Sequence, residues 1–277
     1  MAGTLYLVAT PIGNLRDFSP RGIEVLHTVD FIAAEDTRVT LKLLNHFGVR
    51  KPMVSYYRHN EDIRGDEILS RLLDGEDCAL VTDAGTPAIS DPGEALVALC
   101  AENGVEVTAI PGACAFVAAL AVSGLPTGRF TFEGFLPMNK KNRRAHLDSL
   151  REECRTMVFH EAPHKLPATL RDLAETFGPD RRVSLCRELT KLHEEVRRTT
   201  LGQAADHYAQ NPPKGEFVLV VEGAPEQEEA SYTLEDGLAL VERLKGEGLS
   251  TRDAVKQAAA DLDLPKKALY DRAVGKW

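Results

Sequence analysis

Short apolar runs alternate with longer amphipathic segments along the first half of the chain. The runs have the length and residue types of buried strands, while the segments between them repeat their apolar positions with helical spacing. This alternation predicts a mainly parallel sheet covered by helices. The predicted strands are residues 5–9, 31–34, 53–56, 78–81 and 105–110, and the predicted helices are residues 20–26, 37–47, 61–73 and 96–102.

A polar stretch at residues 134–142 interrupts this pattern and is interpreted as a boundary or hinge. The alternation then resumes, so the chain is predicted to be an α/β protein with two α/β domains, residues 1–135 and 136–225, and a ligand cleft between them. The strands predicted in the second domain are residues 156–160, 182–186 and 216–222, and its helices are residues 143–153, 165–177 and 202–209.

The remaining region, residues 226–277, is predicted to be a linker followed by helices. A Pro/Glu/Gln-rich stretch at residues 223–231 precedes helical patterns at residues 234–245, 251–261 and 265–274. Thr251 is expected to cap the second helix, and Pro265 is expected at the first position of the third. Residues 237–277 contain eight Lys/Arg and six Asp/Glu, unlike the acidic remainder.

Composition narrows the function classes. The net charge of −9 argues against a protein covered by nucleic acid over its whole surface, but leaves room for a local basic patch. The five cysteines are scattered and never spaced C-x-x-C, which disfavours disulfides and a cysteine zinc site and favours a reducing compartment.

No membrane segment is expected. The N-terminus enters a strand-like run without a basic region ahead of an apolar core, so no signal peptide is predicted. Residues 107–128 carry no charge, but prolines and glycines leave only residues 113–123 as a helix, too short to cross a bilayer. A cytoplasmic protein is therefore expected.

The loop at residues 81–93 is the most informative segment. It follows a predicted strand, where open α/β sheets bind their ligands, and it is longer than an ordinary connection. Gly85 and Gly93 allow close backbone approach, while Asp83 and Asp91 offer acceptors for hydroxyl or ammonium groups. A ligand loop is the favoured interpretation, and a structural turn is the alternative.

Two further loops repeat this arrangement, at residues 9–15 and 110–115. The first has a single glycine and lacks the G-x-G-x-x-G dinucleotide fingerprint, and either loop alone is as well explained by a tight turn. Together the three loops predict a backbone-lined pocket for a nucleoside-like or amino-acid-like ligand.

His160–His164 matches H-E-x-x-H, but a metalloprotease needs that motif on a helix. Residues 156–160 are predicted to be a strand and Pro163 would break a helix, so no metal is expected there. We instead expect Glu161 and Ala162 to face the cleft.

Charged residues follow two other strands. Arg187, Glu188 and Lys191 are interpreted either as a solvated turn with ion pairs or as groups beside a reacting centre. Residues 34–38 put Asp36 and Arg38 at another strand end, where a helix cap and ion pair explain them equally well.

A basic stripe follows the predicted boundary. A solvated helix face and a phosphate-contacting surface for RNA explain it equally well. Its RNA-binding candidates are Lys140, Lys141, Arg143 and Arg144, with Arg151 one to two turns further on.

These motifs occur together in the order seen in one family. The chain resembles the 2′-O-ribose methyltransferases of ribosomal RNA within the tetrapyrrole methylase superfamily, over residues 4–222. The matching segments are Ala9–Leu15, Ala34–Arg38, Asp83–Pro87, Ser90–Gly93, Pro111–Gly112, Phe132–Pro137, Glu161–His164, Arg187–Lys191 and Lys214–Glu216. His160 departs from the family pattern, where Tyr is common.

The resemblance implies a tetrapyrrole methylase-like fold that binds S-adenosyl-L-methionine in the interdomain cleft, releases S-adenosyl-L-homocysteine and forms a homodimer. The implied substrate is a cytidine ribose in the decoding region of small-subunit (16S) ribosomal RNA, on the assembled 30S particle. The cofactor-binding residues that follow are Pro11, Gly13, Asp83, Ala84, Gly85, Thr86, Ile89, Ser90, Ala113, Ala115, Glu161, Ala162, Arg187, Leu189 and Gly215.

A ribose hydroxyl is a weak acid, so a base or cation near it is expected to help methyl transfer. Glu188 and Asp36 are the candidate bases, while Lys191 and Arg38 are candidates to lower the hydroxyl pKa or to anchor phosphate. The sequence does not choose among them.

Two other functions stay open. A small-molecule methyltransferase acting on a tetrapyrrole would share the fold but not the need for a basic stripe. A DNA-binding regulator using residues 251–274 as a helix-turn-helix would leave the two sheets unexplained.

Overall fold

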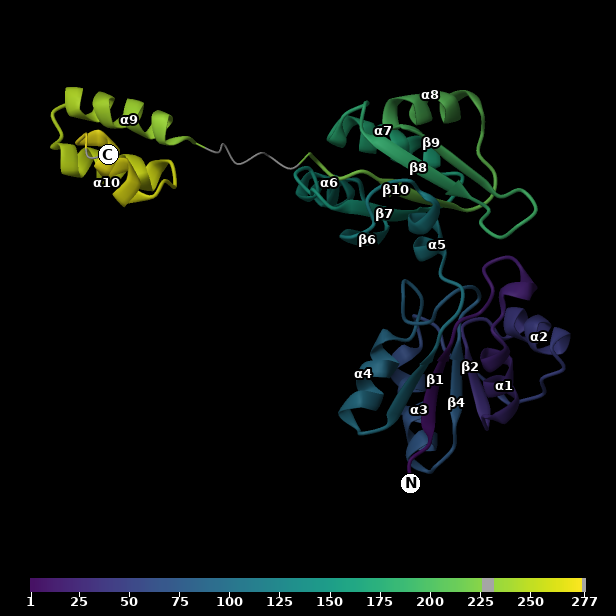
Figure 1. Ribbon diagram of the computed structural model, residues 1–277. Helices are drawn as coiled ribbons and strands as arrows, with labels where there is room; N and C mark the ends of the chain where they lie inside the picture. Colours follow the sequence, from purple (N-terminus) through teal and green to yellow (C-terminus); the bar gives the residue numbers. More distant parts are fainter. Residues whose placement is uncertain (226–231, 276–277) are drawn as a thin grey trace. The chain divides into compact units, whose positions relative to one another are not determined.

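The computed structural model describes residues 1–225 and 232–275 (Figure 1). It divides into two compact units, Met1–Ala224 and Pro225–Trp277. Residues 226–231 of the predicted linker lie outside the described residues.

The alternating pattern predicted a mainly parallel sheet, and the first sheet is parallel throughout. Its strand order is β3-β2-β4-β1-β5. Its strands are β1 (Thr4–Val8), β2 (Phe31–Ala34), β3 (Met53–Ser55), β4 (Cys78–Val81) and β5 (Glu106–Ile110). Helices cover both faces: α1 (Pro20–Thr28) and α2 (Thr37–His46) on one, α3 (Glu61–Leu73) and α4 (Glu94–Glu102) on the other. A short 3-10 turn, η1 (Leu15–Asp17), precedes α1.

Helix starts in this half follow local capping. The Ser19 hydroxyl accepts a hydrogen bond from the Gly22 amide, and Pro20 occupies the first helical position of α1. The Asp36 carboxylate accepts from the Arg38 amide at the start of α2. Both caps stand just after strand-end loops, so they fix the direction in which each loop leaves its strand.

The second sheet is mixed, with strand order β6-β7-β10-β8-β9. Its strands are β6 (Phe130–Phe135), β7 (Thr156–Glu161), β8 (Arg182–Arg187), β9 (Glu195–Thr200) and β10 (Phe217–Val221). One face packs against α5 (Ala115–Val122), and the other against α6 (Lys140–Ser149), α7 (Leu166–Phe177) and α8 (Leu201–Gln210) (Figure 1). Only β6 and β7 pair in parallel.

Two strands of this sheet were not predicted. β6 contains Gly134, which has φ +60° and lies where the pairing with β7 shifts register. This irregularity interrupts the apolar alternation by which a strand is recognised. β9 reads Glu-Val-Arg-Arg-Thr-Thr and lies at the sheet edge, where charged side chains are common. The expected domain boundary after residue 135 stays a prediction, although β6 pairs into the second sheet.

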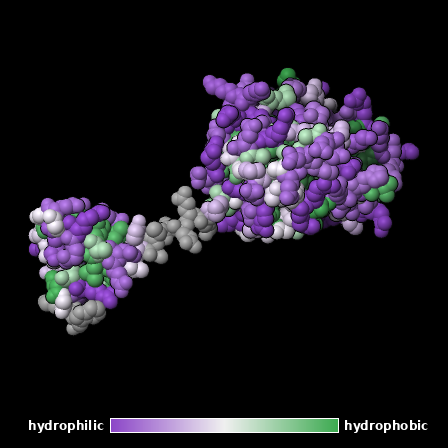
Figure 2. Space-filling view, turned by 90° about the horizontal axis from the view of Figure 1, so that it is seen from above, coloured by the Kyte–Doolittle hydropathy of each residue, from purple (hydrophilic) through white to green (hydrophobic). Residues whose placement is uncertain are grey.

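The smaller unit holds three helices, α9 (Leu234–Gly246), α10 (Thr251–Asp261) and α11 (Lys266–Ala273). They pack around Val241, Val255 and Leu269, and apolar patches remain visible between polar ones on the face seen in Figure 2. The predicted caps were wrong by one residue. Ser250 caps α10, because its hydroxyl accepts from the Asp253 amide, and Pro265 stands before the first residue of α11.

None of the helices among the described residues combines the length and apolar character that crossing a membrane requires.

Candidate functional site

A cavity of about 410 Å³ lies where the strand-end loops of the first sheet meet α5 and the second sheet. This volume falls in the usual range for small-molecule sites. Several residues of its wall have small side chains: Ala84, Gly85, Ala115 and Ala162.

Hydrogen bonds join the three predicted loops into one rim. Thr10 and Gly85 exchange two backbone hydrogen bonds of 2.9 and 3.0 Å. The Thr86 hydroxyl donates to the Ala113 carbonyl at 3.0 Å, and the Thr10 hydroxyl to the Thr82 carbonyl at 3.0 Å. The loops therefore form a continuous rim at the carboxyl edge of the first sheet.

Backbone strain is concentrated at this cavity. Among the residues that the structure describes, five non-glycine residues have positive φ, and four of them lie in two loops at the cavity: Ala88, Ser90, Glu188 and Thr190. Such conformations cost about 1–3 kcal/mol each and gather at functional sites. The two loops are held in shape at the expense of stability.

Lys191 lines the cavity between two carboxylates. Its Nζ donates to Glu188 Oε1 at 3.0 Å and to Glu216 Oε2 at 2.8 Å. Burial disfavours the charged amine, but the hydrogen bonds to Glu216 and Glu188 outweigh it and raise the pKa of Lys191. Lys191 is therefore a fixed cation in the cavity wall.

Glu188 holds that cation in place. Its Oε1 also accepts from the Glu216 amide at 3.0 Å, and the hydrogen bond from Lys191 is the main reason that the pKa of Glu188 is lowered. A carboxylate committed to two donors is a poor base, so the structure favours Glu188 as the group that orients Lys191.

Two predicted glycines make room for this pair. A Cβ at Gly13 would lie 2.5 Å from Lys191 Cγ, and a Cβ at Gly215 would lie 2.5 Å from Glu188 Cδ. Neither glycine lines the cavity itself. Their place is beneath the Lys191–Glu188 pair.

Asp91 is the one aspartate among the described residues that line the cavity. Burial, together with the nearby carboxylates of Glu35 and Asp83, raises its pKa to about 6. Asp83 does not line the cavity: its Oδ1 accepts from the Asp36 amide at 3.2 Å and links two strand ends. Asp91 is thus the aspartate that a bound ligand would meet.

Asp36 and Arg38 lie outside the cavity wall and pair with each other at 2.7 Å. Hydrogen bonds from Arg38 hold the pKa of Asp36 to about 2, which leaves it a weak base. The geometry supports the helix-cap interpretation of this pair over the chemical one.

His160 presents a polar atom without a partner. Its Nε2 is buried and has no hydrogen-bond partner among the described residues, and the residue lines the cavity beside Phe135, with ring centroids 5.4 Å apart. Burial lowers the pKa of the imidazole, which favours the neutral form. A neutral ring of this kind offers one hydrogen bond to an uncharged ligand group.

The predicted cofactor residues therefore divide. Those that line the cavity are Ala84, Gly85, Thr86, Ile89, Ser90, Ala115, Glu161, Ala162 and Leu189. Those that do not line it are Pro11, Gly13, Asp83, Ala113, Arg187 and Gly215. Arg187 points to the opposite face of β8, where its Nη1 pairs with Glu195 at 3.2 Å.

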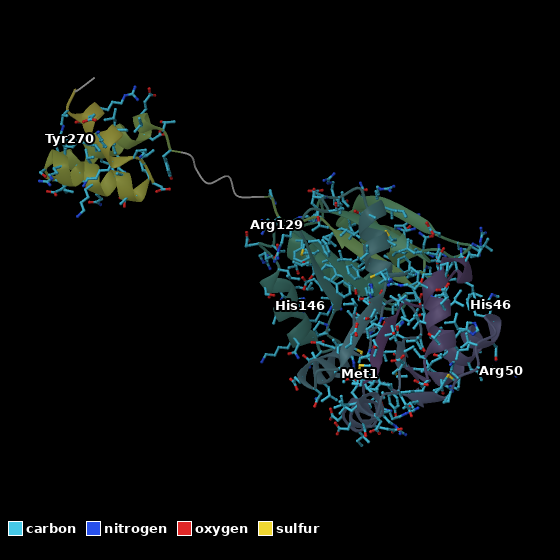
Figure 3. The ribbon with its side chains drawn as sticks, turned by 60° about the horizontal axis from the view of Figure 1, so that its bottom comes forward. Met1, His46, Arg50, Arg129, His146 and Tyr270 are labelled. Carbon is cyan, nitrogen blue, oxygen red and sulfur yellow. The ribbon has the colours of Figure 1, made fainter. Side chains whose placement is uncertain are left out.

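The basic stripe forms α6, capped by the Asn139 side chain. Lys140, Lys141 and Arg144 are exposed there, but Arg143 turns inward, where its Nε bonds Asp172 Oδ2 at 2.5 Å and its Nη2 bonds Thr169. His146, labelled in Figure 3, ties α6 to β6 through Glu133 at 2.8 Å. Arg143 thus serves the fold, and the other three face solvent.

Several residues that line the cavity were not among the predicted site residues: Asp91, Cys114, Phe116, Phe135, His160, Cys186 and Glu216. Asp91 was expected only as a hydrogen-bond acceptor in its loop. Glu216 belongs to the matching segment Lys214–Glu216. A carboxylate that could pair with the predicted site residue Lys191 was the signal that could have identified it. The aromatic residues belong to β6 and α5, and nothing in the pattern of β6 predicted a strand ending at the cavity.

Comparison with known proteins gives concordant matches. The model for tetrapyrrole (corrin/porphyrin) methylases matches residues 4–205, and the model for the RsmI C-terminal HTH domain matches residues 233–276. A Synechocystis protein named ribosomal RNA small subunit methyltransferase I is 50% identical over 268 residues, which are 97% of this chain and 96% of that protein. A Xylella fastidiosa protein of the same name is 49% identical over 270 residues, or 97% and 98% of the two chains.

Among solved structures, uroporphyrin-III C-methyltransferase from Thermus thermophilus in complex with S-adenosyl homocysteine superposes with a TM-score of 0.56. The match covers 79% of this chain and 97% of that one at 15% identity, which supports the fold alone. The predicted architecture, two α/β halves with a cleft and a helical C-terminal region, is confirmed.

Proposed function

The chain belongs to the tetrapyrrole (corrin/porphyrin) methylase family, within the group named ribosomal RNA small subunit methyltransferase I, and from this membership we propose its reaction. It transfers a methyl group from S-adenosyl-L-methionine to the ribose 2′-oxygen of a cytidine in the decoding region of small-subunit ribosomal RNA. The acceptor is the assembled 30S particle, and the enzyme is a cytoplasmic homodimer. The observation that carries the proposal is a fixed ammonium, Lys191, in the wall of a small-residue cavity.

The cavity suits the cofactor. Ala84, Gly85 and Ala115 leave the backbone accessible to a flat adenosine group, and His160 Nε2 offers an unused polar atom. Asp91 and Glu216 put negative charge at the wall, which favours a cationic sulfonium. When bound, S-adenosyl-L-methionine supplies an electrophilic methyl group.

Lys191 would face the acceptor hydroxyl. An ammonium beside a hydroxyl favours its ionised form and stabilises the charge that develops on oxygen. Glu188 and Glu216 keep that ammonium in one position, so no reorganisation is needed during the reaction.

Asp91 is the favoured proton acceptor among the carboxyls considered. Its raised pKa makes it a stronger base than Asp36, whose pKa is lowered to about 2. Its place in the cavity wall also puts it within the enclosed site, whereas Asp36 lies outside. Most of the rate enhancement would come from holding the two reactants in line.

The RNA would contact exposed cations around this site. Lys140, Lys141 and Arg144 on α6 lie in solvent on the helix that follows β6, whose last residue, Phe135, lines the cavity. Phe135 is 58% exposed and suits stacking with a nucleobase.

Labelled-methyl transfer tests the proposal. The purified protein is given labelled S-adenosyl-L-methionine with unmodified small subunits, a reduced tetrapyrrole or duplex DNA as acceptor. We expect label only in ribosomal RNA. Label in the tetrapyrrole would identify a small-molecule enzyme, and cofactor binding without transfer to any acceptor would contradict the proposed substrate.

A further inference from the structure

A second hollow, of about 260 Å³, opens on the opposite face of the second sheet. Arg187, Arg197, Lys214 and His207 line it, with Glu195 as its one carboxylate. Phe217 lies beneath it and also lines the main cavity. The two hollows therefore lie back to back across the segment from Lys214 to Phe217.

Strand register explains how the charges meet. Glu195, Arg187 and Phe217 are direct neighbours on β9, β8 and β10, and Arg197 lies two residues along β9 on the same face. The adjacent residue Cys186 points the other way, into the main cavity. The last two residues of β8 therefore line different hollows: Cys186 lines the main cavity and Arg187 lines the second hollow.

Glu195 arranges the two guanidinium groups. Its Oε2 accepts from Arg187 Nη1 at 3.2 Å, while its Oε1 accepts from Arg197 Nε at 3.2 Å and Nη2 at 3.0 Å. Arg187 Nε donates to the Lys214 carbonyl at 2.8 Å. Within the described part of the chain, Arg187 Nη2, Arg197 Nη1 and Lys214 Nζ keep donors without a partner.

We propose that this hollow binds a backbone phosphate of the RNA whose ribose enters the main cavity, which rests on the proposed function. Three cations against one carboxylate leave an excess of positive charge, and guanidinium donors match phosphate oxygens in geometry. A strand of RNA crossing the Lys214–Phe217 segment would meet Lys191 on one side and these donors on the other.

Two substitutions that remove charges of opposite sign from the second hollow test the proposed phosphate site. Arg197→Gln removes a donor, and we expect the Kd for small-subunit RNA to rise about tenfold. The dependence of log K on log salt should become shallower by about 0.7, as for one lost phosphate contact on a single strand.

Glu195→Gln removes the competing negative charge, so it should tighten RNA binding. Lys214→Gln, in an exposed segment, is a second variant that leaves the ion pairs intact.

Arg182→Gln is the matched control, because Arg182 starts β8 at the end away from Arg187 and pairs with Glu222 outside the hollow. It should change neither RNA affinity nor salt dependence. The Kd for S-adenosyl-L-methionine should stay the same in all four variants.

Three results would overturn the site. Weaker RNA binding in both Glu195→Gln and Arg197→Gln, in step with lower thermal stability, would mean a structural ion triad. RNA affinity unchanged in Arg197→Gln and Lys214→Gln would mean that no phosphate binds there. Saturation by inorganic phosphate without competition against RNA would assign a free anion. If the wild type itself neither binds nor methylates RNA, the proposed function fails first.

Discussion

At the scale of single residues, the site depends on how one cation is held. Lys191 is fixed by Glu188 and Glu216, and glycines at positions 13 and 215 leave space for the pair. The raised pKa of Lys191 makes it a lasting positive charge rather than a base. Its role is therefore electrostatic.

Lys191→Met tests that role. Loss of a fixed donor to developing charge typically lowers kcat by about 10²-fold, and we expect a fall of this size with little change in the Kd for S-adenosyl-L-methionine. Lys42→Met, on an exposed position of α2, is the control for lost charge. A large rise in cofactor Kd with normal kcat would instead show that Lys191 anchors the cofactor.

Asp91 gives a pH-dependent signature. Its folded pKa of about 6 exceeds the ordinary value of 3.8, so the folded state binds this proton more readily than the unfolded state. The ionised Asp91 carboxylate therefore lowers the free energy of unfolding above pH 6. This destabilisation disappears as the pH falls towards 4 and the carboxyl takes up its proton. Asp91→Asn should be more stable than the wild type at pH 7 and equal to it near pH 4.

Thermal denaturation across this range measures the effect, and Asp66→Asn, an exposed aspartate on α3, is the control. If Asp91→Asn is no more stable than the wild type at pH 7, the carboxyl is not held in an unfavourable environment. Loss of methyl transfer at every pH in the same variant would support its role as the proton acceptor.

At the scale of elements, the first sheet was predictable and much of the second was not. Apolar runs such as residues 78–81 are buried on both faces and stand out in the sequence, and all five strands were found. β9 has too few apolar residues to be recognised, and β6 is broken at Gly134. The pocket-forming loops were predictable together, because three of them follow strands whose carboxyl ends meet at one edge of a parallel sheet.

Side-chain direction was the limit for the candidate site. Arg187 is the last residue of β8, and the residue before it, Cys186, faces the cavity. Because successive side chains of a strand point to opposite faces, Arg187 lies on the other side. Arg143 was assigned to RNA but bonds Asp172, a partner 29 positions away that no local pattern reveals. Such pairings depend on tertiary contacts.

Gly215→Ala tests how far the loop before β10 controls the site. The position has φ +84° and a Cβ would press on Glu188, so both strain and displacement are expected. Gly48→Ala is the control, with φ +69° and nothing within 4 Å of its Cβ. We expect the control to lose about 1–2 kcal/mol of unfolding free energy and keep activity.

Gly215→Ala should lose more than the control in urea denaturation and should also lose methyl transfer, because Lys191 loses its fixed partner. Equal destabilisation of the two variants with full activity in both would mean that the position of Glu188 is unimportant.

At the scale of the whole molecule, the two units have separate cores. The cavity is lined entirely by residues of Met1–Ala224, while α9, α10 and α11 pack around their own apolar residues. Cofactor binding should therefore not need the smaller unit, whose excess of Lys and Arg over Asp and Glu suits a role in substrate binding.

A chain ending at residue 224 tests this division of roles. We expect its Kd for S-adenosyl-L-methionine to match that of the full chain in calorimetry, and its KM for small subunits to rise. A truncated protein that folds but does not bind the cofactor would contradict the assignment of the cavity to the larger unit alone.

Nucleoside analysis by mass spectrometry shows whether the methyl group is placed on a cytidine ribose. Unmodified small subunits are incubated with the protein and S-adenosyl-L-methionine, and the ribosomal RNA is then digested to nucleosides. We expect one new product, 2′-O-methylcytidine, and its formation about 10²-fold slower with Lys191→Met. A methyl group on a base would contradict the proposed reaction, and so would unmodified RNA from subunits incubated with enzyme that binds the cofactor.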